Sequence, residues 1–245
     1  MFGVSRTEKA IILLHSSGKA IYKEWRGESI GTEHGEIAAK DVEKGGLVKS
    51  KLGGEYLVLP AGVRDRVQNE RRGARPIYEY DAGFAAGLLA LGKTKRVLEA
   101  GTGSASATQV FAGMCESVDT FEREERFYEI AKENIALSGL ANIRLTHGDV
   151  NEAELERERY DAVFLDLKEP AKALGHVWPA LKKGGYACVF TPHNGDLKPV
   201  MEKYDELGAV QALTVKLENK QLNRRLAEIG YLSYPAYFIS ARKFR

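Results

Sequence analysis

The order of hydrophobic and polar positions divides the chain into two parts with different periodicities. In residues 1–60, short runs of alternating hydrophobic and polar residues are separated by glycine, as in "KAIYKEWRG" and "EYLVLPAG". Strands with one solvated face have this period of two residues, and turn residues between them favour hairpins. We therefore predict a small antiparallel β domain over residues 1–60.

Beyond residue 80 the pattern changes to alternating strands and helices. Near-continuous apolar runs predict strands at "RVLEA", "SVDTFE", "IRLTHGD", "YDAVFLDL" and "YACVFT". Apolar residues at helical spacing separate these runs, with one helix expected from Pro170 through Leu181. Repeated β–α units of this kind predict a parallel sheet covered on both faces. The last two strands, "VQALTVKL" and "YPAYFISARK", have no helix between them and are expected to form an antiparallel edge hairpin.

A basic connector joins the two parts. The stretch "AGVRDRVQNERRGARPIYEY" (61–80) contains Arg64, Arg66, Arg71, Arg72 and Arg75. Charge runs are usually a solvated helix face with a loop, and that interpretation stays open beside a role in binding a polyanion. If the connector is counted with the α/β part, the domains are residues 1–60 and 61–245.

Composition narrows the function classes only a little. The chain has 245 residues, 44% of them hydrophobic, with a formal net charge of +2 and a pI near 8.4. This charge permits a nucleic-acid partner without arguing for one. The early stretch "AIILL" is too short for a signal-peptide core or a membrane span, so no membrane association is expected. Cys115 and Cys188 form no CxxC pair, and we expect no metal site, no disulfide and a cytoplasmic location.

A glutamate directly before a glycine-spaced turn is the first sign of chemistry. The stretch "RVLEAGTGSASAT" places Glu99 at a strand end and Gly101 and Gly103 just after it, where open α/β sheets bind ligands. A dinucleotide motif would have a third glycine at Ser106, and a carboxylate repels a diphosphate at short range. Because a carboxylate attracts an ammonium group, the turn fits S-adenosylmethionine better than NAD.

Three more carboxylates follow at the ends of the next strands. Glu122 ends "SVDTFE" and is expected to accept both ribose hydroxyls. Asp149 in "THGDV" is expected to accept from the adenine amino group, and Asp166 follows the fourth strand in "FLDLKEP". One carboxylate at a strand end is often a cap or a solvated residue, but the ordered set indicates cofactor binding.

Three stretches carry a resemblance to a known family. "RVLEAGTGSASAT", "YDAVFLDLKEP" and "HGEIAAKDVEKGGLVKSKLGGEYLVLPA" are similar to the tRNA (adenine-58-N1)-methyltransferase family of bacteria and archaea. The resemblance runs from about His34 to about Pro192, with the closing "YFISARK", and it includes the N-terminal β module. It implies an α/β fold with a seven-stranded, Rossmann-like class I methyltransferase domain behind that module, usually assembled as a homotetramer.

The resemblance also implies which residues bind S-adenosylmethionine. It assigns the methionine end to Glu99, Gly101, Thr102, Gly103 and Ser104. For the ribose and the adenine, the implied residues are Glu122, Arg123, Asp149 and Val150.

The implied reaction is methylation of N1 of an adenine in the T-loop of tRNA, at position 58 or also at 57. Asp166 takes the place of the family's essential aspartate, so it is the expected catalytic residue as well as a cofactor contact. The expected substrate contacts are Tyr78, His193, Arg72 and Arg75. Further phosphate contacts are expected from Lys49, Lys51, Arg224 and Arg225.

The sequence departs from the family pattern at three places. Ala171 follows Pro170 where the family often has tryptophan, and Asp196 stands where glutamine is usual. The stretch "NKQLNRRLAEIGYLSYPAYF" replaces an arginine–proline segment. Because these regions shape the target-base pocket, two other functions stay open. One is a methyltransferase acting on a protein or a small molecule, and the other is a non-catalytic RNA-binding subunit that accompanies an active paralogue.

Overall fold

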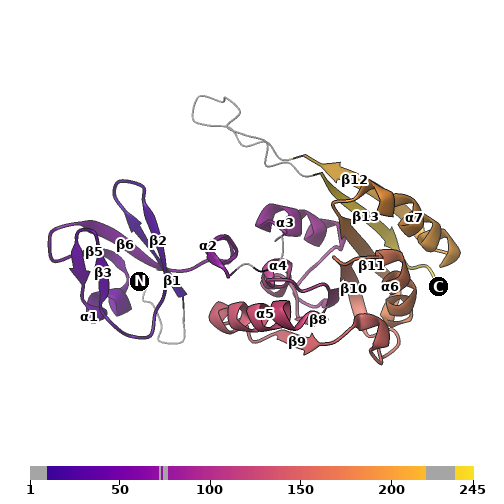
Figure 1. Ribbon diagram of the computed structural model, residues 1–245, viewed down its shortest axis with the longest axis horizontal. Coiled ribbons are helices and arrows are strands. Elements are labelled where there is room, and N and C mark those ends of the chain that lie inside the picture. Colours follow the sequence, from indigo (N-terminus) through magenta and orange to yellow (C-terminus); the bar gives the residue numbers. More distant parts are fainter. Residues whose placement is uncertain (1–9, 72, 74–76, 219–234) are drawn as a thin grey trace.

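The computed structural model describes residues 10–71, 73, 77–218 and 235–245. Figure 1 shows a small β module and a larger α/β part, with the short helix α2 (Val63–Asn69) between them. No helix in these described ranges is both long enough and apolar enough to cross a membrane.

The N-terminal module is an antiparallel sheet, as the period of two residues predicts. Its strands lie in the order β2-β1-β6-β5. Their bounds are β1 Ala10–His15, β2 Ala20–Glu24, β5 Gly46–Lys49 and β6 Glu55–Pro60. The hairpin of β3 (Ile30–Thr32) and β4 (Gly35–Ile37) and the short helix α1 (Ala39–Lys44) complete the module.

The module has a core of its own. Ile11 and Leu13 of β1 face the same side as Tyr56 and Val58 of β6, and all four side chains are buried. Burial alternates at the start of β6, whereas β1 is buried at four consecutive positions, Ala10–Leu13. The antiparallel β module itself is confirmed.

The larger part is built on one sheet of seven described strands, in the order β12-β13-β11-β10-β7-β8-β9. The strands are β7 Arg96–Ala100, β8 Ser117–Glu122, β9 Ile143–His147, β10 Tyr160–Leu165, β11 Leu181–Thr191, β12 Val210–Leu217 and β13 Ala236–Arg242. Neighbours from β11 to β9 pair parallel, whereas β13 runs antiparallel to both β11 and β12. The α/β class and the antiparallel edge pair are both confirmed.

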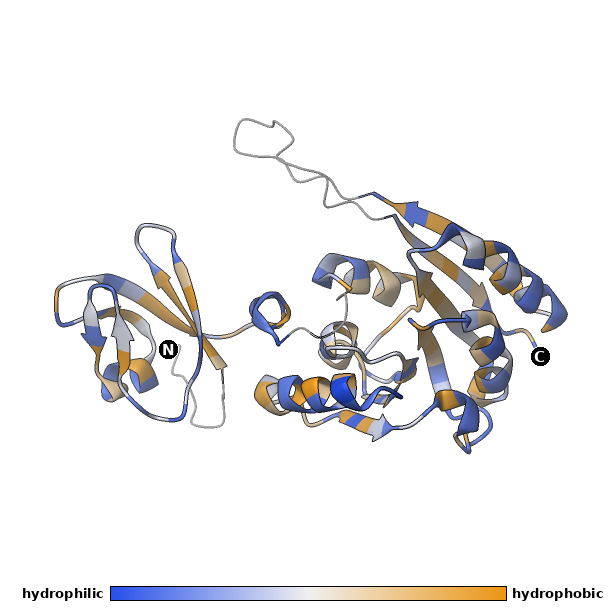
Figure 2. Ribbon diagram, in the orientation of Figure 1, coloured by the Kyte–Doolittle hydropathy of each residue, from blue (hydrophilic) through white to orange (hydrophobic). Residues whose placement is uncertain are grey.

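Helices cover both faces of this sheet (Figure 1). One face carries α3 (Glu79–Leu88), α4 (Ser106–Ala112) and α5 (Glu125–Ser138), and the other carries α6 (Pro170–Val177) and α7 (Leu197–Glu206). Successive residues of β10 point to opposite faces, so Phe164 packs in one core and Val163 in the other. Figure 2 shows the central strands as the most hydrophobic part of this domain.

The helix expected over Pro170–Leu181 ends earlier, at Val177. A proline at 179 inside a continuing helix would remove one backbone hydrogen bond and clash with the preceding turn. The chain instead forms a short 3₁₀ turn, Trp178–Ala180, and enters β11 at Leu181. The buried Lys243 then donates from Nζ to the carbonyl oxygens of Trp178 (3.0 Å) and Leu181 (2.6 Å).

Candidate active site

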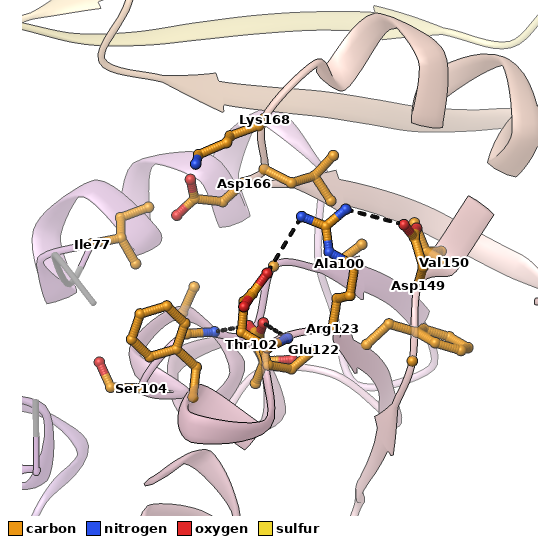
Figure 3. Close-up of a pocket in the computed structure, with 18 of the residues that line it drawn as sticks. Ile77, Ala100, Thr102, Ser104, Glu122, Arg123, Asp149, Val150, Asp166 and Lys168 are labelled. Atoms are coloured by element: carbon orange, nitrogen blue, oxygen red, sulfur yellow. Dashed lines mark hydrogen bonds and ion pairs between the residues drawn. The ribbon is translucent and has the colours of Figure 1, made fainter. Parts of the chain in front are cut away.

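A cavity of about 480 Å³ lies at the carboxyl ends of the central strands (Figure 3). Strand order reverses on either side of β7, and open α/β sheets bind ligands at such a point. Nine of the residues selected from the sequence line this cavity: Gly101, Thr102, Gly103, Ser104, Glu122, Arg123, Asp149, Val150 and Asp166.

Glycine is required at position 101 because the ends of β7 and β10 approach each other closely there. Its φ is +89°, and a Cβ added there would lie 1.8 Å from the backbone oxygen of Asp166. The Asp166 amide donates to the Ala100 carbonyl oxygen at 2.9 Å, which holds the two strand ends together. Only glycine combines this backbone conformation with so little space.

Glu122 fastens the turn from the neighbouring strand. One carboxylate oxygen accepts from the Gly103 amide at 2.9 Å, and the other accepts from the Glu124 amide at 2.9 Å. Because each carboxylate oxygen can accept more than one hydrogen bond, the carboxylate can hold the turn and still accept from a ligand in the cavity.

Arg123 and Asp149 form an ion pair along the same wall. An Arg123 Nη1–Asp149 Oδ2 distance of 3.3 Å joins the two, and Figure 3 shows the contact. Hydrogen bonds from the backbone and side chain of Asn151, together with Arg123, hold the pKa of Asp149 below its usual range. Asp149 therefore stays ionised at neutral pH and acts as a hydrogen-bond acceptor.

Glu99 is the one member of the predicted cofactor set that does not line the cavity. Its side chain is 1% exposed and lies beneath the turn, where Thr108 Oγ1 donates to Glu99 Oε2 at 2.6 Å. Burial raises the pKa of Glu99 to about 7, although hydrogen bonds from Thr108 and Thr120 lower it. Thr120 also hydrogen-bonds Thr102 at 2.6 Å, so the carboxyl supports the turn from below. This placement does not support a direct contact between Glu99 and an ammonium group.

Two of the predicted substrate contacts, Tyr78 and His193, lie outside the cavity lining. Tyr78 stacks on Tyr80, with ring centroids 5.2 Å apart, and neither residue is part of the lining. His193 is exposed after β11 and also lies outside the lining. Arg72 and Arg75, like Arg224 and Arg225, fall outside the described residues.

The lining also contains residues that the sequence analysis did not select. Lys168 follows Asp166 by two positions in the same loop and is drawn near it in Figure 3. Phe121, Phe127 and Ile77 supply apolar surface. Lys168 could have been selected from the sequence because it follows a strand end. Phe127 lies on α5, and its position in the sequence gives no comparable indication.

In the described part of the chain, the cations expected to bind phosphate form contacts within the protein. Lys49 pairs with Glu55 at 3.5 Å, and Lys51 pairs with Glu36 at 3.3 Å. In the connector, Arg64 lies 3.5 Å from Glu79, Arg71 pairs with Glu133, and Arg66 donates to the Ala61 carbonyl oxygen. Exposed ion pairs of this kind contribute little to stability and can be exchanged for other partners.

The fold is shared with a solved structure along the whole chain. A structure described as a SAM-dependent O-methyltransferase from Thermotoga maritima superposes with a TM-score of 0.83 at 22% identity, covering 100% of this chain and 96% of that one. Because the likeness spans the whole chain, the N-terminal module belongs to the shared architecture.

Sequence comparison then gives the family. Residues 70–239 match the family described as "tRNA methyltransferase complex GCD14 subunit", and the chain belongs to this family. It is 33% identical to the tRNA (adenine(58)-N(1))-methyltransferase TrmI of Thermus thermophilus over 76% of this chain and 70% of that protein. It is 24% identical to the tRNA (adenine(57)-N(1)/adenine(58)-N(1))-methyltransferase TrmI of Methanocaldococcus jannaschii, over 91% and 93% of the two chains. The resemblance seen in the sequence is confirmed.

Replacing Gly101 by alanine should destabilise the protein strongly. The new methyl group would collide with the Asp166 carbonyl oxygen in a backbone conformation unfavourable for alanine, at a combined cost of about 3 kcal/mol. Urea unfolding measures the loss. Gly83→Ala is the matched control, because Gly83 lies exposed in α3 with open space around its Cβ position. That change should raise stability by up to about 1 kcal/mol, and equal effects of the two substitutions would contradict the packing argument.

Replacing Glu99 by glutamine should alter how stability depends on pH. A carboxyl whose folded pKa is about 7, against an ordinary 4.5, favours folding most at low pH and loses that contribution as pH rises through 7. From pH 5 to pH 8 the native protein should therefore lose up to about 3 kcal/mol of unfolding free energy relative to Glu99→Gln. Urea titrations across this range measure the difference, and parallel profiles for the two proteins would rule out a buried, titrating Glu99.

Proposed function

We propose that this protein transfers a methyl group from S-adenosylmethionine to N1 of an adenine in the T-loop of tRNA, at position 58 or at 57 and 58. The observation that carries the proposal is the set of three carboxylates, Glu122, Asp149 and Asp166, that line one cavity at the ends of neighbouring strands. Membership of a tRNA methyltransferase family supports the choice of substrate.

The residues of the cavity fit S-adenosylmethionine. S-adenosylmethionine carries a sulfonium and an ammonium group, and the carboxylates of the cavity attract both positive charges. A site that binds a diphosphate would not need these carboxylates. Glu122 would accept hydrogen bonds from the ribose hydroxyls, and Asp149 would accept one from the adenine amino group. Ser104 lines the cavity, and its hydroxyl is buried with no hydrogen-bond partner among the described residues. A polar ligand would satisfy that hydroxyl, because buried polar groups are normally paired.

Asp166 is the proposed catalytic residue. S-adenosylmethionine, when bound, supplies a methyl group on a sulfonium sulfur that leaves as a neutral thioether. The adenine N1 has a free lone pair at neutral pH, so the protein needs no strong base and instead has to orient the base, which can contribute about 7–11 kcal/mol. Asp166 would accept a hydrogen bond from the adenine 6-amino group and stabilise the positive charge that grows on the ring.

The adenine must leave its stacked position to enter the cavity. Unstacking costs a few kcal/mol, which contacts in the pocket have to offset. Phosphate groups would compete with the acidic partners of Lys49, Lys51 and Arg71, so tRNA binding should weaken as salt concentration rises. In a homotetramer, the proposed assembly, such cations from several subunits would combine along one RNA. The cytoplasm is the proposed location.

Transfer of label from S-adenosylmethionine to unmodified tRNA tests the function. We expect incorporation that stops reverse transcriptase at position 58, or at 57 and 58, and that disappears when the target adenines are replaced by guanine. Cofactor binding without transfer to tRNA would favour a protein or small-molecule substrate. RNA binding without cofactor binding would favour a non-catalytic subunit.

Replacing Asp166 by asparagine should lower kcat by roughly 10²–10³-fold, because the negative charge beside the ring is lost while the shape is kept. The Kd for S-adenosylhomocysteine should change far less, since Glu122 and Asp149 remain. Single-turnover methylation and calorimetry measure the two quantities. Asp205→Asn on the exposed side of α7 is the matched control and should behave as the native protein. Unchanged kcat in Asp166→Asn would remove Asp166 from the mechanism.

A further inference from the structure

The side chain of Asn134 joins three separate segments of the chain. It lies on α5 and is 3% exposed. Its Nδ2 donates to the backbone oxygen of Ser104 in the cavity turn at 2.9 Å and to that of Arg71 in the connector at 2.9 Å. Its Oδ1 accepts from the Arg71 amide at 3.1 Å. One buried amide therefore uses both its ends to hold the connector against the turn.

A second set of contacts lies one residue earlier in the connector. Glu70 accepts from the Ser106 hydroxyl and from Gln109 Nε2, the latter at 3.2 Å. Ser106 and Gln109 lie on α4, the helix that begins directly after the turn. We name Glu70, Arg71, Ser104, Ser106, Gln109 and Asn134 the connector clamp.

The chain stays close to the cavity just after the clamp. A Cβ at Gly73 would lie 2.3 Å from Ile130 and 3.0 Å from Phe127, so the backbone at 73 packs directly on α5. Phe127 and Ile77 both line the cavity. The backbone at Gly73 is thus packed against Phe127, a side chain of the cavity wall.

The N-terminal module meets the clamp from the other side. Tyr22 and Glu24 of β2 and Arg66 of α2 line a small cavity of about 30 Å³ together with Gln109 and Asn134. A displacement of the connector would therefore move the module relative to the turn.

We infer that Asn134 and Glu70 are positioning residues that couple the cofactor cavity to the placement of the N-terminal module. The inference rests on the proposed function. A ligand that contacts Ser104 fixes the turn, and the fixed turn favours one position of the connector through Asn134. A tRNA held by the module and the larger domain together favours the same position. Because coupling between two sites is reciprocal, cofactor and tRNA should each increase the affinity of the other.

Calorimetric titration with S-adenosylhomocysteine, in the absence and presence of saturating unmodified tRNA, measures the coupling. For the native protein, Kd should be at least about fivefold lower with tRNA. In Asn134→Ala and in Glu70→Ala the ratio of the two Kd values should fall below about twofold, as expected when a coupling pathway is cut. Glu70 is only half-buried, so the second variant leaves the core untouched.

Asn142→Ala is the matched control. Asn142 Nδ2 also donates to backbone oxygens, those of Ala112 at 2.8 Å and Cys115 at 3.2 Å, but these contacts do not reach the connector. Its loss should lower the melting temperature and leave the Kd ratio as in the native protein. A ratio near one for the native protein, or a native ratio in both clamp variants, would overturn the inference while methylation of tRNA still stood. Failure of S-adenosylhomocysteine to bind both without and with tRNA, or failure of tRNA to bind under either condition, would overturn the proposed function itself, and this inference with it.

Discussion

The backbone of Asp166 passes Gly101 so closely that any side-chain carbon at 101 would lie 1.8 Å from a carbonyl oxygen. This approach brings the ends of β7 and β10 together and makes the chain turn back at once. Because the turn is tight, the Gly103 amide reaches Glu122, and α4 begins within reach of the connector. The sequence indicates that Gly101 leaves room for a ligand. In the structure, Gly101 first leaves room for the backbone of Asp166. The contact between Gly101 and Asp166 fixes the turn, and residues 101–104 of this turn line the cavity.

Much of the α/β part could be predicted because strands buried on both faces have to be apolar throughout. The bounds of β7 and β8 agree with the runs that predicted them, and both strands are mostly buried. The end of α6 could not be predicted in the same way, since the apolar pattern continues through Trp178 to Leu181. The helix stops there because of Pro179 and because Lys243, 65 residues later than Trp178, binds the carbonyl groups left over. Such a contact leaves no trace in local periodicity.

The candidate site was predictable in part for a related physical reason. Parallel strands place their carboxyl ends at one edge, so Glu122, Asp149 and Asp166 had to come near one another. The position of a residue along a strand does not, however, show how deeply its side chain is buried. Glu99 lies beneath the turn, and burial raises its pKa to about 7. Nor does charge in the sequence show which partner a cation takes. Arg66 and Arg71 bind this chain's own carbonyl and carboxylate groups, and only the folded arrangement shows that.

The two parts of the molecule have separate apolar cores. Among the described residues, the apolar cluster of the N-terminal module contains no residue of the larger domain, whereas Val67 of α2 packs into the larger domain's core. Interfaces without a large apolar area are poorly suited to hold domains rigidly. The hydrogen bonds of Asn134 hold the connector to the cavity turn, and Tyr22 and Glu24 of the module line a small cavity beside them. An enzyme that accepts a large, folded RNA gains from this arrangement, because a connector held to the cavity turn links the placement of the module to the cavity.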